Sequence, residues 1–127
     1  MAHFLSAVLG GGPFSLRIER SGAVLGSALV IAGDSTTRRE GLLGRDALSP
    51  GSGLVIAPSQ GVHTFGMRFP IDVVCVTRAG VVVKYRSAVP PRRLVLAWSA
   101  FAMIELAAGE SARAGLQPGD TLTAQLS

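Results

Sequence analysis

Hydrophobic and polar residues alternate along short segments of the chain, and this alternation predicts β-strands. Phe14, Leu16 and Ile18 occupy every second position, as in a strand that buries one face. The apolar runs at 71–77 and 81–86 flank Arg78-Ala79-Gly80, which predicts a β-hairpin. Other short apolar runs predict further strands, at residues 23–32, 54–57, near 62, 94–98, 102–107 and 121–125.

The number and brevity of these runs predict a mostly β fold of the β-rich α+β class. We expect a compact, mainly antiparallel and barrel-like domain of seven or eight short strands with one or two short helices. Thr37 followed by Glu40 fits a capping box, which predicts a short helix over 40–43 with Gly44 as its C-terminal cap. A single helical turn is expected at 111–114.

The length of 127 residues corresponds to one domain, which we place at residues 13–127. Residues 1–12 are mildly apolar, end in three glycines, and are predicted to form a flexible N-terminal extension. This segment has no basic region, and its apolar run is too short to span a bilayer. We therefore expect no membrane span and a cytoplasmic location.

The net charge of +4 bears on the class of partner. Apart from Lys84, the twelve basic residues are arginines, and they are scattered singly or in pairs. Since nucleic-acid binding needs a basic patch, this distribution argues against a nucleic-acid partner. Cys75 is the single cysteine and lies in an apolar run, so we interpret it as a small buried hydrophobe. An internal disulfide and a multi-thiolate zinc site are excluded.

The segment from His63 to Asp72 contains the strongest candidate chemistry, because a histidine, Arg68 and an aspartate enter a region otherwise suited to burial. If this segment is an extended strand, His63, Phe65 and Met67 share one face. A carboxylate such as Asp72 can fix the tautomer of a neighbouring imidazole, which prepares the other ring nitrogen as a base or a ligand.

Each of these chemical interpretations has a structural alternative. Asp72 can instead be a buried acceptor for backbone amides or for Arg68. Adding Glu105 gives a His/Asp/Glu set, which is also the ligand class of a borderline metal site, but no second histidine at ligand spacing accompanies it. We therefore predict neither a metal site nor a cofactor. Arg45, beside the predicted short helix, is a candidate for binding an anion. The alternative is a surface ion pair with a neighbouring acidic residue.

Two aromatic residues late in the chain lie where burial is the default expectation. These are Trp98 and Phe101. If both are exposed beside His63, they indicate a surface for a ligand or partner.

Three blocks of the chain, in this order and spacing, resemble the domain of unknown function 192 family, a small bacterial and archaeal domain. They are Arg38-Arg39-Glu40-Gly41-Leu42-Leu43-Gly44-Arg45 with Leu48, the segment His63–Asp72, and Glu105-Leu106-Ala107-Ala108-Gly109 with Gly115-Leu116 and Gly119-Asp120. The resemblance covers residues 24–126 and implies a single compact β-rich domain with short helices, without an assigned activity. Family members often carry signal peptides and a tryptophan before the methionine, where this chain has Gly66.

Three classes of function remain open. The first is a non-catalytic binding or accessory module that holds a small anionic ligand or a protein partner through the region of His63 and Asp72. The second is a hydrolase-type or metal-assisted enzyme in which His63 is the base and Asp72 orients it, with Glu105 or Arg68 assisting. The third is a nucleic-acid-binding module. We favour the first, because little of the constellation that an active site requires is present.

Overall fold

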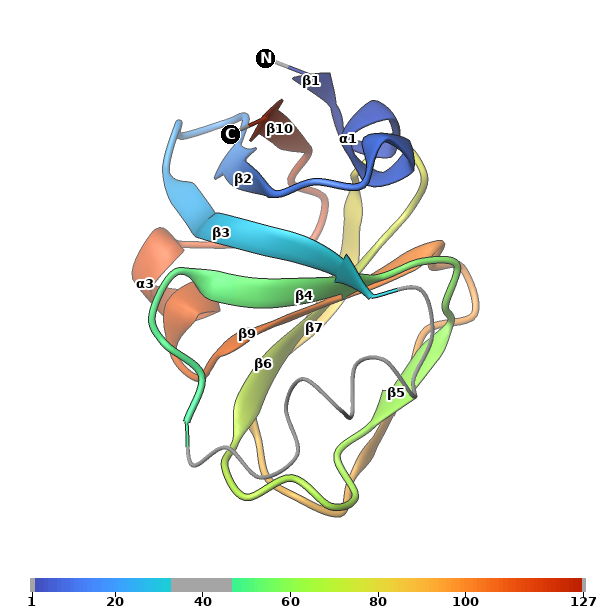
Figure 1. Ribbon diagram of the computed structural model, residues 1–127, viewed down its shortest axis with the longest axis vertical. Coiled ribbons are helices and arrows are strands. Elements are labelled where there is room, and N and C mark those ends of the chain that lie inside the picture. Colours follow the sequence, from blue (N-terminus) through green and yellow to red (C-terminus); the bar gives the residue numbers. More distant parts are fainter. Residues whose placement is uncertain (1, 33–46, 127) are drawn as a thin grey trace.

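The computed structural model describes residues 2–32 and 47–126 and has a mostly β fold, as predicted. A curled sheet forms a half-barrel, accompanied by a two-stranded ribbon and short helices (Figure 1). The helix predicted over 40–43 lies outside the described residues. The described elements are β1 (Ala2–His3), α1 (Phe4–Gly10), β2 (Phe14–Ile18), β3 (Val24–Ala32), β4 (Ser52–Ile56), β5 (Gly61–His63), β6 (Ile71–Val76), β7 (Val82–Val89), β8 (Leu94–Leu96), β9 (Ala102–Ala107), α3 (Glu110–Ala114) and β10 (Leu122–Leu126).

Within the described residues, the main sheet has the strand order β1-β10-β2-β3-β4-β9-β6-β7, and β5 pairs with β8 in the separate ribbon. Neighbouring strands are antiparallel except for β3 and β4, which run parallel. The predicted hairpin is formed by β6 and β7. The sheet is therefore mainly antiparallel, as the short connections between its strands predict.

The curl of the sheet brings its two ends together at the turn between β6 and β7. Val81 forms an isolated bridge with Thr121, and the N–H of Leu122 donates to the carbonyl oxygen of Gly80 at 2.8 Å. Gly80 has a φ of +81°, and a Cβ atom there would lie 2.8 Å from both the carbonyl oxygen of Leu122 and the Cβ of Phe4. Only glycine allows this turn to approach both β10 and α1 so closely.

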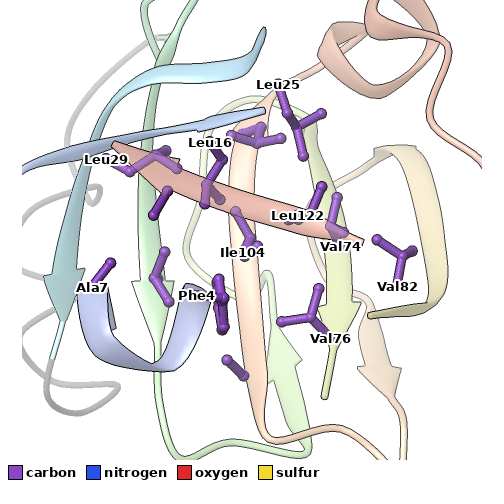
Figure 2. Packing of buried hydrophobic residues seen from close by; sticks show 14 of the residues in the cluster. Phe4, Ala7, Leu16, Leu25, Leu29, Val74, Val76, Val82, Ile104 and Leu122 are labelled. Carbon is purple, nitrogen blue, oxygen red and sulfur yellow. The ribbon is translucent and has the colours of Figure 1, made fainter. Parts of the chain in front are cut away.

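The central strands β6 and β9 are buried on both faces and are apolar except for Asp72 and Glu105. One face contributes Val74, Ile104 and their neighbours to a cluster that fills the inside of the curl, which we call the first core (Figure 2). The other face contributes Val73 and Met103 to a second core, which also contains Met67, Phe69, Val62 and Val95. The second core attaches the β5–β8 ribbon to the sheet.

The N-terminal residues form part of the first core. This finding differs from the flexible extension predicted for residues 1–12. Residues 2–3 pair with β10, and α1 follows directly, with the Nδ1 atom of His3 accepting from the N–H of Leu5 at 3.3 Å. Phe4, Ala7 and Val8 are buried in the first core. Their i, i+3, i+4 spacing is the signal of a helix with one apolar face, hidden here by the shortness of the helix and the glycines after it.

A bidentate ion pair joins the turn after β2 to the turn before β10. The guanidinium of Arg20 donates to both carboxylate oxygens of Asp120, at 2.8 and 3.0 Å, and to the carbonyl oxygen of Gly115 at 3.0 Å. The hydrogen bond from Arg20 lowers the pKa of Asp120, to which the N–H of Gln117 also donates. The pair holds these two turns together at the end of the half-barrel.

Replacing Phe4 with alanine tests whether α1 belongs to the core. We expect Phe4→Ala to lower the free energy of unfolding by about 3–5 kcal/mol, because it leaves a cavity beneath the sheet. Leu9, which is 76% exposed on the same helix, is the matched control, and Leu9→Ala should change stability by less than about 0.5 kcal/mol. Urea denaturation followed by circular dichroism measures both. Equal stability of the two variants would contradict the placement of α1.

Candidate functional site

The β5–β8 ribbon places the candidate histidine on the surface. Val62 and Val95 face each other across the ribbon and are buried in the second core. Because side chains alternate along a strand, His63 and its cross-strand partner Leu94 lie on the opposite, outer face, as does Leu96. His63 is half-buried there, and Leu94 is 61% exposed.

A buried threonine fixes the end of this ribbon. The Thr64 hydroxyl donates to the carbonyl oxygen of Pro90 at 2.7 Å and accepts from the N–H of Arg93 at 2.9 Å. Its backbone N–H donates to the carbonyl oxygen of Arg93 at 2.9 Å, and its carbonyl oxygen accepts from Arg92 at 3.2 Å. Thr64 thus joins β5 to the turn between β7 and β8. Thr64 was not among the residues predicted to be functional, although a polar residue beside the apolar end of a strand was the available signal.

The chain turns after Thr64, and the predicted common face of His63, Phe65 and Met67 is therefore wrong for Met67. Gly66 has a φ of +84°, and the N–H of Met67 donates to the carbonyl oxygen of Thr64 at 3.2 Å, as in a β-turn. Met67 points into the second core, whereas Phe65 is 54% exposed. The ring of Phe65 packs against that of His63 with 5.7 Å between their centroids.

Asp72 is completely buried, and its carboxylate accepts hydrogen bonds from three backbone amides. The N–H groups of Ala88 and Gly109 donate to Oδ1 at 2.8 and 3.1 Å, and that of Ser111 donates to Oδ2 at 2.9 Å. This confirms the interpretation of Asp72 as a buried acceptor for backbone amides. None of these hydrogen bonds comes from His63, so Asp72 does not orient the imidazole as the enzyme hypothesis requires.

Glu105 is also completely buried, but it lies on the other face of the sheet. Its cross-strand partner on β6 is Val73, a residue of the second core. Since Asp72 precedes Val73, its side chain points to the opposite face, toward α3. The His/Asp/Glu set is therefore not assembled. Among residues 2–32 and 47–126, no group of three or more His, Cys, Asp or Glu side chains is placed to hold a metal ion.

The remaining candidates divide between core and surface. Cys75 is buried in the second core, as predicted, and burial raises the pKa of its thiol, which keeps the sulfur protonated at neutral pH. Arg68 is exposed on the segment between β5 and β6. Arg45 lies outside the described residues.

A basic groove lies between β7 and β8. It has a volume of about 340 Å³, and its lining consists of Lys84, Arg86, Ser87, Val89, Pro90, Arg93, Leu94, Val95 and Leu96. Lys84 and Arg86 lie across from Cys75 and Val73, so both side chains are on the same face of the sheet as the second core. The groove therefore combines three cationic side chains with leucines, and no carboxylate is among its lining residues in the described part of the chain.

The outer face of the ribbon is unusually apolar. It carries exposed Leu94 and Leu96, with Phe65 at one end and Trp98 at the other. Trp98 is 74% exposed, which differs from the expected burial, whereas Phe101 is only partly exposed and packs against the first core. Trp98 lies in the turn after β8, which the hydrogen bond from the N–H of Ala100 to the carbonyl oxygen of Ala97 closes at 3.0 Å.

The family model DUF192, described as "Uncharacterized ACR", matches residues 17–124. The chain belongs to the DUF192 family. This confirms the resemblance of the three sequence blocks, and no curated protein sequence matches the chain.

Two crystal structures show the same fold as this DUF192 chain. A Sinorhizobium meliloti protein named a "putative transcription regulator" has a TM-score of 0.74 at 21% identity, with 87% of this chain and 91% of that chain covered. A protein of unknown function from Novosphingobium aromaticivorans has a TM-score of 0.72 at 21% identity, with 87% and 82% covered. At this identity the likeness concerns the fold alone. None of the described helices is long and apolar enough to cross a membrane.

The structural importance of the Asp72 carboxylate is tested by Asp72→Asn. We expect a loss of about 3 kcal/mol or more in the free energy of unfolding, because one side-chain oxygen becomes an NH₂ group that faces buried N–H donors. Glu19→Gln, which removes an exposed carboxylate, is the control and should change stability by less than about 0.5 kcal/mol. Urea denaturation at pH 7 measures both variants. A stable Asp72→Asn protein would show that the three amides do not need the charge.

Proposed function

We propose that this DUF192 chain is a non-catalytic binding module for an acidic and partly apolar segment of a partner protein. The segment would bind in the groove between β7 and β8 and extend over the outer face of the ribbon, beside His63 and Phe65. The observation that carries the proposal is the charge of the groove. Among residues 2–32 and 47–126, three cations and two leucines line it, without a carboxylate.

The three cations lack counter-ions on the described part of the chain. Lys84, Arg86 and Arg93 form no ion pair there, and the guanidinium groups make only long contacts to the neighbouring carbonyl oxygens of Tyr85 and Arg92. Like charges at close quarters repel each other, so an anionic ligand lowers the energy of the groove. Carboxylates are matched partners for guanidinium groups, with which they form charge-assisted hydrogen bonds.

The form of the groove favours an extended segment. Lys84 and Arg86 are two residues apart on β7, and side chains at that spacing repeat every 6–7 Å or so along a strand. In the described strand order, β7 is the last strand of the main sheet. Val82 at its start is bonded to the turn before β10, so an extended segment can pair with the edge of β7 beyond that residue. A partner with acids at every second position would match the cations, and its apolar residues would contact Leu94 and Leu96.

Peptide binding is better supported than the two alternative functions. The name of the Sinorhizobium meliloti neighbour raises the possibility of nucleic-acid binding, but single-stranded nucleic acid is usually held by aromatic stacking, and the groove is lined by leucines. An enzyme with His63 as its base would need an orienting carboxylate. Asp72 is engaged by backbone amides, and Glu105 lies within the second-core face.

A random library of nine-residue peptides displayed on phage tests the proposal. We expect selection against the protein to enrich Asp and Glu in alternation with apolar residues. The most enriched peptide, titrated into isotope-labelled protein, should shift amide resonances of β7 and β8. The double variant Lys84→Glu/Arg86→Glu should weaken its affinity by tenfold or more, since two favourable charge contacts become repulsive.

Arg17→Glu, on β2, is the matched control and should bind the peptide like the wild type. Enriched peptides without an acidic excess, or shifts confined to other strands, would overturn the proposal. Stronger shifts of the same amides by a single-stranded DNA 12-mer would also overturn it, in favour of a nucleic-acid partner.

A further inference from the structure

A second cavity lies on another part of the surface, at the tip of the β6–β7 hairpin. Its volume is about 640 Å³, within the range of small-molecule sites. Its lining combines aromatic, cationic and small polar side chains from three turns, including Arg78, Trp98, Phe101, Ser59, Gln60 and Ser99. None of its lining residues belongs to the basic groove, and none is acidic.

Hydrogen bonds hold the three turns in place. The N–H of Phe101 donates to the carbonyl oxygen of Val76 at 2.8 Å, and its carbonyl oxygen accepts from the N–H of Ser59 at 2.8 Å. The side-chain amide of Gln60 donates to the carbonyl oxygen of Trp98. The frame of the cavity is therefore fixed before any ligand arrives, which lowers the entropic cost of binding.

Arg78 supplies an oriented anion-binding group. Its guanidinium lies over the ring of Phe101, 5.0 Å from the centroid, and forms no ion pair within the described residues. A cation–π contact with the ring restricts where the guanidinium lies, and its N–H groups that point away from the ring can donate to a carboxylate or phosphate. Since none of the described lining residues is acidic, none of them repels an anion there.

Trp98 supplies a surface for a flat ring. The indole is 74% exposed at the cavity, although tryptophan is among the side chains that gain most from burial. A planar aromatic group stacked on the indole would cover this surface.

From these two features we propose that the cavity binds a small planar aromatic anion. The ring would stack on Trp98, and the carboxylate or phosphate would pair with Arg78. A nucleoside monophosphate and an aromatic carboxylate both have this chemistry. The groove itself is lined by different residues, and Trp98 also borders the outer face of the ribbon, so variants of Arg78 and of the groove cations distinguish the two proposals.

The chain contains a single tryptophan, so its fluorescence reports on the surroundings of Trp98, which lines this cavity. With excitation at wavelengths where the ligand does not absorb, we expect AMP or benzoate to quench the emission in a saturable way. Ribose 5-phosphate, which has no ring, and acetate should leave it unchanged. Saturable quenching by AMP but not by benzoate would identify a nucleotide site. Saturable quenching by benzoate but not by AMP would identify a site for aromatic carboxylates.

Arg78→Gln should weaken the affinity for the quenching ligand by tenfold or more, with the fold checked by circular dichroism. Arg17→Gln is the control and should not change it. Trp98→Phe removes the signal, so its binding is measured by calorimetry and should weaken by a smaller factor, because phenylalanine keeps part of the stacking. Absence of saturable quenching by both AMP and benzoate would overturn the proposal. So would unchanged affinity in Arg78→Gln, or quenching by a single-stranded oligonucleotide alone.

Discussion

The position of the basic groove depends on the buried carboxylate of Asp72. It accepts N–H groups from the end of β7 and from the start of α3, so a single side chain fixes three elements. Ala88, one of these donors, has a φ of +49°, which is an unfavourable conformation for a residue with a Cβ atom. The hydrogen bond to Asp72 helps to hold Ala88 there, and the chain then leaves the sheet toward Pro90.

Thr64 fixes the next part of the polypeptide in the same way, through its hydrogen bonds. Its four hydrogen bonds attach the turn after Pro90 to the end of β5, and the turn leads directly into β8. Two buried polar residues thus determine how far β8 lies from β7, and with it the width of the basic groove. Burial of polar groups costs free energy unless they are hydrogen-bonded, so these fully engaged residues specify one geometry of the turn.

The sequence was sufficient to predict much of the fold, because a period-two pattern such as Phe14, Leu16 and Ile18 directly reflects the alternation of side chains in a strand. It was insufficient for the site, because contacts between strands depend on register. From the sequence alone, Asp72 and Glu105 were candidates for one site. The pairing of Glu105 with Val73 places the two side chains on opposite faces of the sheet. A one-residue shift in register would reverse this result, and no local pattern fixes the register of β6 against β9.

The clustering of charge on the surface could not be predicted from the sequence either. The basic residues are dispersed along the chain, but the β7–β8 connection brings Lys84 and Arg86 to the same groove as Arg93. The net charge of +4 gives no sign of this cluster, since it arises from the path of the backbone. Within the segment from His63 to Asp72, Thr64 and Asp72 position the surface by burial, while residues outside that segment supply the exposed charge of the groove. A polar residue in an apolar segment must be hydrogen-bonded wherever it lies, so its presence alone cannot separate a folding constraint from a binding group.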